Sequence, residues 1–358
     1  MSASVLSYTS GKTDTLLDVA GFRLGQAENR EALTGVTVLL APAGSVAGAD
    51  LRGGGSGTRE FNLLDPLTAT DQVHAIVLSG GSAFGLDAAG GVMAWLEERG
   101  VGFDTGVAIV PLVPQAILFD LGLGDGRIRP DQAMAREACD NAIADGSRLA
   151  QGNYGAGCGA SIGKLRQGKG AMKSGIGSAS LTLENGFRVG AIVAVNALGD
   201  VYEDNQIIAG MLETASPAQA AGGKADELGA VDASRKAVFA DSSRCLLDLG
   251  AISFAGAAPP APGTNTTIGI IATNGIFTKA QCCKIASMGH DGMARAIRPV
   301  HTGMDGDLLF TVASCEMPAS TDVAGEMAAL AVERAIIKAV KAAAPAGGLP
   351  SWQSFHNK

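Results

Sequence analysis

Aromatic and charged side chains are scarce in this sequence, at 4% and 17% of its 358 residues, whereas 47% are hydrophobic. A chain of this length and hydrophobic content can build a large buried core. Its 50 glycines follow no Gly-X-Y period, which excludes a collagen-like polymer. We therefore expect a compact globular enzyme or binding protein with an interior of Ala, Val, Ile and Leu.

An excess of positive charge is also absent. The formal net charge is -8, and sequence-independent affinity for nucleic acids requires many Lys and Arg contacts. The N-terminus lacks a basic start followed by an apolar stretch, and no segment reaches 18 uninterrupted apolar residues. We expect a soluble, cytoplasmic protein with neither a nucleic-acid partner nor a membrane partner.

Cysteine and histidine lack the spacings that are typical of metal sites. The six cysteines form no C-x-x-C pair, and the four histidines form no H-x-x-x-H pair. In a reducing compartment, scattered cysteines are usually small buried apolar residues. The sequence therefore predicts no metal site.

Short β-branched runs bounded by glycine alternate with helical patterns. The runs predict strands at 36–40, 75–78, 107–110, 179–183, 189–195, 267–272 and 308–312. The helical patterns cover 82–98, 130–145, 279–297 and 322–342, with Pro130 in the first helical turn. Together they predict a protein that mixes α and β structure.

Residues 215–264 are rich in Ala, Gly and Pro with weak periodicity, which predicts a linker. The strand signal NTTIGIIATN follows at once. A threonine in a strained turn can attack the preceding carbonyl through Oγ, and hydrolysis of the resulting ester would leave Thr266 as a new N-terminus. Its α-amine, with an ordinary pKa of about 8, could then serve as the general base of its own hydroxyl. Threonines after linkers are common, so this motif alone is unspecific.

The glycine-rich stretch 155–164 supports several interpretations. Its resemblance to phosphate-binding loops is incomplete, and we discard nucleotide binding. Ser161-x-x-Lys164 matches a serine and lysine pattern of penicillin-recognising enzymes without its companion motifs, which makes Ser161 a minor alternative nucleophile. Lys164 is either a surface lysine or a partly buried one with a lowered pKa.

Asp305 and Asp307 flank one glycine just before the strand predicted at 308–312. The triplet D-G-D most often forms a polar turn. In the functional interpretation, both carboxylates lie on one side of an extended segment and orient a neighbouring hydroxyl or ammonium group.

Over nearly its whole length the chain resembles the DmpA-type aminopeptidase and nylon-oligomer hydrolase family. The blocks that carry the resemblance are LRGGGSGTRE, LSGGSAFGLDAAGGVMAWLEERGVGF, VPQAILFDL, GNYGAGCGASIGKL, GAIVAVNALGDV, NTTIGIIATN and HDGMARAIRPVHTGMDGDLLF. The resemblance implies an α+β fold, a four-layer αββα sandwich of the N-terminal nucleophile hydrolase type that ornithine acetyltransferases share. It also implies one internal cut, no cofactor and a homotetramer.

The resemblance assigns roles to matching positions. The bond between Asn265 and Thr266 matches the cleavage junction, so that a single domain, 1–358, would be cut into 1–265 and 266–358. Thr266 matches the nucleophile. The other matches surround it: Lys164 as the neighbouring lysine, Asn196 as the amide that stabilises the oxyanion, and Asp305 with Asp307 as the pair that orients the threonine.

The substrate side of the site is less closely matched. Threonine at the junction and D-G-D downstream resemble the nylon-oligomer hydrolases, whereas the aminopeptidase branch typically carries serine as nucleophile. Phe119 stands where several members have tyrosine, so a hydroxyl donor is lost. Phe119, Gly80, Gly81 and Ser82 are the candidates for lining the substrate pocket.

From the residues and the resemblance we predict a self-processing N-terminal threonine hydrolase that forms an acyl-enzyme on Thr266. Its substrates would be small peptides or unusual linear amides, such as nylon (6-aminohexanoate) oligomers, β-peptides or D-residue peptides. The alternatives are an aminopeptidase and D-esterase with exo specificity, an ornithine-type acetyltransferase, and a non-catalytic binding protein. The last is disfavoured because all the matched site residues are present.

Overall fold

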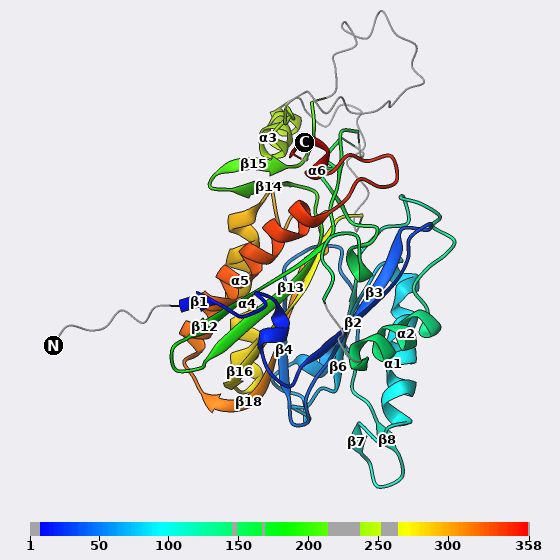
Figure 1. Cartoon of the computed structure of the whole chain (residues 1–358), viewed down its shortest axis with the longest axis vertical. Coiled ribbons are helices and arrows are strands. Elements are labelled where there is room, and N and C mark those ends of the chain that lie inside the picture. Colours follow the sequence, from blue (N-terminus) through cyan, green and yellow to red (C-terminus); the bar gives the residue numbers. More distant parts are fainter. Residues whose placement is uncertain (1–7, 145–148, 167–168, 214–236, 252–263, 357–358) are drawn as a thin grey trace, which may run out of the picture.

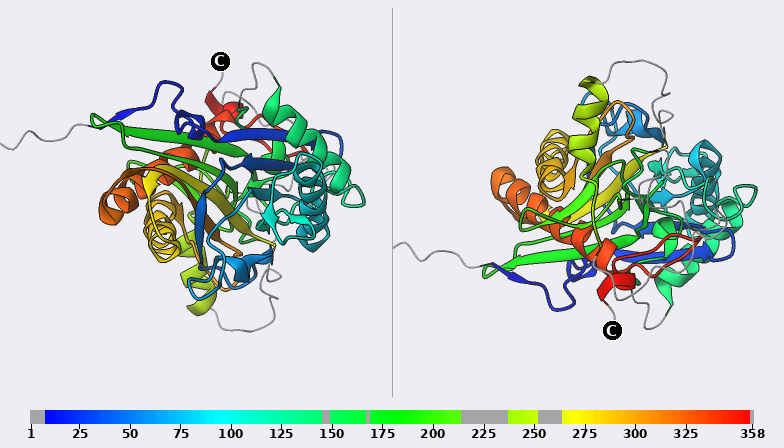
Figure 2. Two further views of the ribbon diagram at one scale, coloured as in Figure 1. Left: turned by 90° about the horizontal axis from the view of Figure 1, so that it is seen from below. Right: turned by 90° about the horizontal axis from the view of Figure 1, so that it is seen from above.

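The computed structural model describes residues 8–144, 149–166, 169–213, 237–251 and 264–356 (Figure 1). Two β-sheets lie face to face, and each is covered by helices on its outer side (Figures 1 and 2). The molecule is thus a four-layer αββα sandwich, as predicted. None of the described helices is both long and apolar enough to cross a membrane.

The larger sheet has six strands in the order β1-β12-β13-β16-β18-β4. Their bounds are β1 (Tyr8–Ser10), β12 (Ile176–Leu183), β13 (Arg188–Asn196), β16 (Thr266–Ile276), β18 (Leu308–Pro318) and β4 (Val46–Leu51). β16 and β18 run parallel, whereas the other neighbours are antiparallel. The strands β16 and β18 both follow the predicted cleavage junction in sequence, yet they pair with strands that precede it.

The smaller of the two packed sheets has five strands in the order β2-β3-β6-β9-β5. Their bounds are β2 (Arg23–Asn29), β3 (Thr34–Leu40), β6 (Ala75–Ser79), β9 (Gln115–Ile117) and β5 (Gly57–Arg59). The ends of β6 and β9 lead into the segments around Ser82 and Phe119, which the sequence analysis assigned to the substrate pocket.

Helices α4 (Lys279–Ala296) and α5 (Thr321–Ala342) cover the six-stranded sheet, while α1 (Ala88–Glu97) and α2 (Gln132–Ile143) cover the five-stranded one. The shorter helices are η1 (Leu16–Asp18), η2 (Phe61–Leu64), η3 (Ser82–Asp87), η4 (Gly155–Gly157), α3 (Ser242–Ala251) and α6 (Gln353–His356). The remaining strands are β7 (Phe103–Asp104), β8 (Ile109–Val110), β10 (Ser161–Ile162), β11 (Met172–Lys173), β14 (Asp200–Glu203), β15 (Gln206–Ala209) and β17 (Ile297–Arg298).

The period of two along each strand explains the layers. On β13, Ala191, Val193 and Val195 pack into the core beneath α4 and α5, whereas Ile192 and Ala194 pack into the core between the sheets. Both faces of the strand are therefore apolar, and the strand reads as a continuous hydrophobic run. This pattern is why the central strands were readily predicted from sequence.

Three predicted elements begin or end elsewhere in the structure. The helix expected at 82–98 opens as the 3-10 helix η3, and α1 begins only at Ala88. Of the strand expected at 107–110, only Ile109–Val110 pairs, because Val107 lies in the exposed turn of the β7–β8 hairpin. Pro130 precedes α2, since Asp131 is its N-cap and accepts a hydrogen bond from Met134 N at 2.9 Å.

The predicted linker at 215–264 is wrong in part, because it contains helix α3 (Ser242–Ala251). The buried carboxylate of Asp200 accepts hydrogen bonds from Ser242 N and Ser242 Oγ and so anchors the start of this helix. This tertiary contact holds the first residue of the helix to β14. Residues 214–236 and 252–263 of the predicted linker lie outside the described residues.

Candidate active site

Thr266 is the first residue of β16, at a point where three chain segments meet. It pairs with Asn196, the last residue of β13, and the preceding residue Asn265 forms a bridge with Asp305. The Thr266 side chain is buried, with 1% relative exposure. The fold therefore brings together a hydroxyl, an amide and a carboxylate that the sequence separates widely.

The carbonyl oxygen of Asn265 accepts two hydrogen bonds. Thr266 Oγ1 donates to it at 2.5 Å, and Gly306 N donates at 2.8 Å. The hydroxyl predicted to attack this peptide group therefore already lies against it in the continuous chain.

Lys164 and Asn196 form the β13 side of the site. Lys164 Nζ donates to Asn196 Oδ1 at 2.8 Å, to Asn196 O at 2.9 Å and to Thr264 O at 3.0 Å. Asn196 Nδ2 donates to Phe119 O at 2.9 Å and, more weakly, to Thr264 O at 3.5 Å. The Thr264 carbonyl thus lies between an ammonium and an amide donor, two residues before Thr266.

Burial lowers the pKa of Lys164 to about 7, although Asp305, Asp120 and Asp307 act in the opposite direction. Desolvation disfavours the charged form, and the nearby carboxylates favour it. An amine with such a pKa is partly neutral near pH 7 and can exchange a proton there.

Asp307 is buried and holds the residue that follows the candidate nucleophile. Its Oδ1 accepts from Thr267 N at 2.8 Å, while its Oδ2 accepts from His301 N at 3.0 Å and pairs with His301 Nδ1 at 2.9 Å. The carboxylate therefore fixes the start of β16 through the backbone.

Asp305 has different partners. Its carboxylate accepts from Thr302 Oγ1 at 2.6 Å, from Thr302 N at 3.1 Å and from Leu198 N at 3.3 Å. Burial raises its pKa, and the neighbouring Asp307 adds to the rise. Among the residues that the structure describes, neither carboxylate accepts a hydrogen bond from the Thr266 hydroxyl, because that hydroxyl donates to Asn265 O instead.

His301 contacts Asp307 but was not identified as a site residue from the sequence. Its backbone φ is 56°, a left-handed conformation that is uncommon outside glycine. Its ring lies edge-on to that of His290, with centroids 4.6 Å apart, and burial lowers the pKa of His290. The sequence signal was its position four residues before the D-G-D motif, in the same block of resemblance; its spacing from the other histidines carries no such signal.

A glycine loop at 53–55, also without an assigned role in the sequence analysis, supports the D-G-D turn. Gly53 N and Arg52 N donate to Asp307 O, and Gly55 N donates to Asp305 O at 2.8 Å. A Cβ on Gly53 would lie 2.2 Å from Asp307 N, so the two backbones approach too closely for any other residue. A Cβ on Gly54 would likewise lie 2.8 Å from Gly303 O, so this packing accounts for the first two glycines of the run.

The substrate-pocket candidates lie on the five-stranded side of the site. Phe119 contributes its carbonyl to Asn196, and Gly81 N donates to the buried carboxylate of Asp120 at 2.7 Å. A Cβ on Gly80 would collide with that same carboxylate, and Ser82 N donates to Leu118 O. The four candidates are thus gathered around Asp120, which the sequence analysis did not single out.

Ser161, the alternative nucleophile, also lies at the site. Its backbone N donates to Asn196 Oδ1 at 3.1 Å, beside the ammonium of Lys164. Proximity alone therefore does not separate it from Thr266, but its described contact with the amide is made by the backbone.

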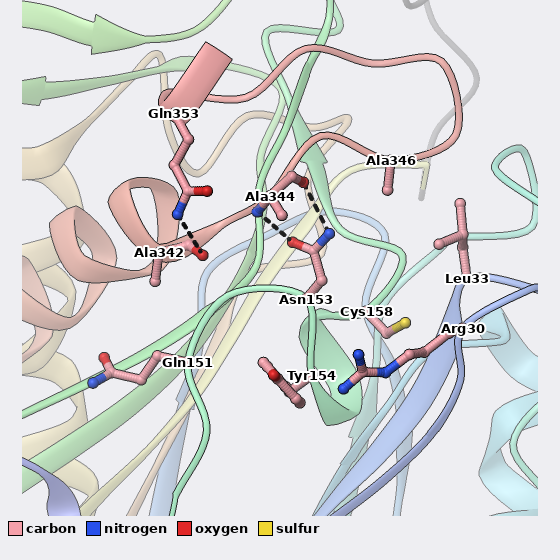
Figure 3. Close-up of a pocket in the computed structure, with 10 residues that line it drawn as sticks. All are labelled: Arg30, Leu33, Gln151, Asn153, Tyr154, Cys158, Ala342, Ala344, Ala346 and Gln353. Carbon is pink, nitrogen blue, oxygen red and sulfur yellow. Dashed lines mark hydrogen bonds between the residues drawn. The ribbon is translucent and has the colours of Figure 1, made fainter. Parts of the chain in front are cut away.

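A pocket of about 430 Å³ lies elsewhere, between helix η4 and the C-terminal segment (Figure 3). Asn153 holds the backbone of Ala344 through both amide atoms, and Arg30 stacks over the ring of Tyr154. The residues that line this pocket include none of the catalytic candidates. The predicted chemistry is therefore not located in it.

Comparison with known proteins identifies the family. The model described as Peptidase family S58 matches residues 14–351. An uncharacterized aminopeptidase of Mycobacterium tuberculosis is 40% identical over 341 residues, which cover 92% of this chain and 90% of the relative. A 6-aminohexanoate-oligomer endohydrolase of Agromyces sp. is 31% identical over 337 residues, or 93% of this chain and 84% of the relative.

Solved structures agree on the fold. A β-aminopeptidase of Burkholderia sp. has a TM-score of 0.65 at 20% identity and covers 98% of this chain and 93% of its own. The L-aminopeptidase D-Ala-esterase/amidase of Ochrobactrum anthropi, described as a variant of the Ntn hydrolase fold, has a TM-score of 0.65 at 19% identity, covering 94% and 89%. The predicted N-terminal nucleophile hydrolase type of fold is therefore confirmed.

Proposed function

The chain belongs to peptidase family S58 and is a hydrolase of amide bonds, and from this premise we propose that it cuts itself between Asn265 and Thr266. The products would be chains 1–265 and 266–358 of a single domain. The new N-terminal Thr266 would then act as the nucleophile toward substrates.

One observation carries this proposal: the Thr266 hydroxyl lies against the peptide group before it, 2.5 Å from the carbonyl oxygen of Asn265. The carbon to be attacked is bonded to that oxygen, so the contact holds the hydroxyl beside its target, and such proximity lowers the barrier of an otherwise unfavourable reaction. The cut chains would stay associated, because β16 and β18 pair with β13 and β4 of the other chain.

After the cut, the same strand end would serve substrate hydrolysis. The free α-amine of Thr266 takes up the hydroxyl proton as Oγ attacks the substrate carbonyl. The C–N bond of the substrate then breaks, the proton passes from the α-ammonium to the departing substrate amine, and an ester to Thr266 remains. Water then hydrolyses this acyl-enzyme. The Thr264 carbonyl, held by Lys164 and Asn196 in the continuous chain, marks where a substrate carbonyl would find two donors.

For the substrate we propose small peptides or linear amides, including 6-aminohexanoate oligomers, β-peptides and D-residue peptides. The support is a relative named as an oligomer endohydrolase at 31% identity and others named as aminopeptidases at 40%. Loss of the tyrosine hydroxyl at Phe119 removes one donor from the substrate side. Comparing end-blocked and free oligomers as substrates would separate endo from exo cleavage.

We propose that the protein assembles as a homotetramer and that it is located in the cytoplasm. The six cysteines are all unpaired, which suits a reducing compartment. A light-scattering mass of one 35.9 kDa protomer at micromolar concentration would contradict the oligomer, and export of the intact protein from fractionated cells would contradict the location.

The test is intact-mass analysis combined with a panel of amides. Wild-type protein should give two masses that fit chains 1–265 and 266–358, yet one species in gel filtration. Thr266→Ala should give one uncut chain without hydrolytic activity, whereas Thr266→Ser should keep some processing. An active wild-type chain that is uncut, or hydrolysis by Thr266→Ala, would contradict the assignment and favour Ser161 with Lys164. Acyl transfer to added ornithine would instead indicate the acetyltransferase alternative.

A further inference from the structure

The two peptide carbonyls that precede Thr266 are bound by different donors. The carbonyl of Thr264 accepts from Lys164 and Asn196, on the β13 side. The carbonyl of Asn265 accepts from Gly306 N at 2.8 Å, on the β18 side. The asparagine amide assigned to the oxyanion is therefore engaged one residue away from the bond proposed to be cut.

We propose that the backbone N–H of Gly306 is the oxyanion donor of self-cleavage, and that it is distinct from the donor used in substrate hydrolysis. This inference rests on the proposed function, since it concerns the cut before Thr266. Gly306, the middle residue of the D-G-D motif, would then take part in catalysis through its backbone N–H and would not serve only to form a turn.

The chemical step defines what this N–H must do. Thr266 Oγ forms a bond to the carbonyl carbon of Asn265, and the carbonyl oxygen takes up negative charge. The bond from that carbon to Thr266 N then breaks, and the hydroxyl proton ends on the departing nitrogen. Water hydrolyses the ester to the Asn265 carboxylate and the Thr266 hydroxyl. A donor already 2.8 Å from the oxygen stabilises the charge without further rearrangement.

The surroundings hold this N–H in place. A Cβ on Gly306 would lie 2.8 Å from Thr266 Oγ1 and 2.9 Å from Gly55 O, so no larger residue fits between the hydroxyl and the glycine loop. Behind the turn, Gly55 N donates to Asp305 O at 2.8 Å. The donor is therefore fixed before the reaction, which is the condition under which a hydrogen bond contributes most to an oxyanion.

A backbone donor is tested by replacing its amide with an ester. Incorporation of glycolic acid in place of Gly306, through an acylated suppressor tRNA, removes this N–H and adds no side chain. The cleavage rate, followed by denaturing gels and intact mass, should fall roughly 100-fold to 1,000-fold, as for loss of other oxyanion donors. Mild alkali breaks the ester after residue 305 and so verifies the incorporation.

The matched control carries glycolic acid in place of Gly55. The ester at 306 also weakens Asp305 O as an acceptor, and the ester at 55 removes the donor to that same oxygen while leaving Gly306 N intact. The control should be cleaved much faster than the 306 ester, because it loses a supporting contact of the turn but keeps the N–H that binds Asn265 O. Cleavage of the 306 ester at the rate of the control would overturn the inference, whereas an uncut wild-type chain would overturn the proposed function itself.

A second measurement needs no backbone replacement and covers the case in which the ester variant does not fold. In the uncut Thr266→Ala chain, labelled with ¹⁵N-glycine, the Gly306 amide should exchange slowly with solvent because Asn265 O accepts its hydrogen bond. Rapid exchange of this amide, in a folded chain with a protected sheet, would overturn the inference.

Discussion

The two sides of Thr266 differ in what they hold. On the β13 side, Lys164 and Asn196 present side-chain donors to the carbonyl of Thr264. On the β18 side, backbone N–H groups and carboxylates dominate: Gly306 N binds Asn265 O, and Asp307 binds Thr267 N. The donors on the β13 side are the side chains of a lysine and an asparagine. The donors on the β18 side are backbone N–H groups packed between glycines.

This difference indicates a division of tasks. The β18 side holds the peptide group before Thr266 and the strand after it, so it suits the proposed self-cleavage. The β13 side holds a carbonyl that would leave with the proposed new C-terminus, so its donors would become available to a substrate. Variants on the two sides should therefore separate maturation from turnover.

Asn196→Ala should separate substrate turnover from self-cleavage the most. Losing an oxyanion donor should lower turnover of a small amide roughly 100-fold to 1,000-fold. Self-cleavage should persist within a few-fold of wild type, because the asparagine amide does not contact Asn265 O. Turnover and cleavage would be measured on the same preparation. Equal losses in both would mean that one set of donors serves both reactions.

His301 tests the β18 side through its hydrogen bond to buried Asp307. His301→Gly and His301→Asn both accept the left-handed backbone, but only asparagine keeps an N–H near the position of Nδ1. Losing this partner of a buried carboxylate should lower the free energy of unfolding by about 1–3 kcal/mol in the glycine variant. The asparagine variant should recover most of that loss.

Urea denaturation in the uncut Thr266→Ala background measures this effect on a single chain. The same substitutions in the wild-type background give the cleavage rate, which should also be slower for glycine than for asparagine. A purely structural histidine would leave the two cleavage rates equal, and such a result would remove His301 from the positioning of Asp307.

Much of the architecture was predictable, because it depends on local periodicity. The apolar runs of β13 and β16 and the patterns of α4 and α5 are long enough to specify their elements, while the layer order came from the resemblance. Helix α3 was missed because it is short, lies in an Ala/Gly/Pro-rich segment, and is anchored by Asp200 far away in sequence.

The site was predictable only as a set of residues. Thr266, Lys164 and the D-G-D motif could be named from the residues and Asn196 from the resemblance, and the fold gathers them at the start of β16. Their partners could not be named: the contacts of Asp305 with Thr302 and the packing of the 53–55 loop on the turn depend on approaches between distant segments. A glycine-rich run indicates that another segment packs closely against the backbone, but it does not identify that segment.

A pH-dependent effect on stability is expected from the charge of Lys164. Burial lowers its pKa to about 7, whereas an unfolded lysine titrates near pH ~10.4. Between these values the unfolded chain binds a proton that the folded chain does not, so stability rises with pH by at most about 1.4 kcal/mol per pH unit. Lys164→Met removes this contribution and keeps an unbranched chain.

Lys173 is fully buried, and burial lowers its pKa to about 7 as well. Because this lysine is present in both proteins, its contribution cancels when the two are compared at each pH. The free energy of unfolding of the Lys164 protein minus that of Lys164→Met, both with Thr266→Ala, should therefore increase between pH 7 and pH 10 and level off below pH 7. A difference that is independent of pH would mean that Lys164 stays charged throughout. Lys164 would then be a permanently charged ammonium group over this pH range, and not a group able to exchange a proton near neutral pH.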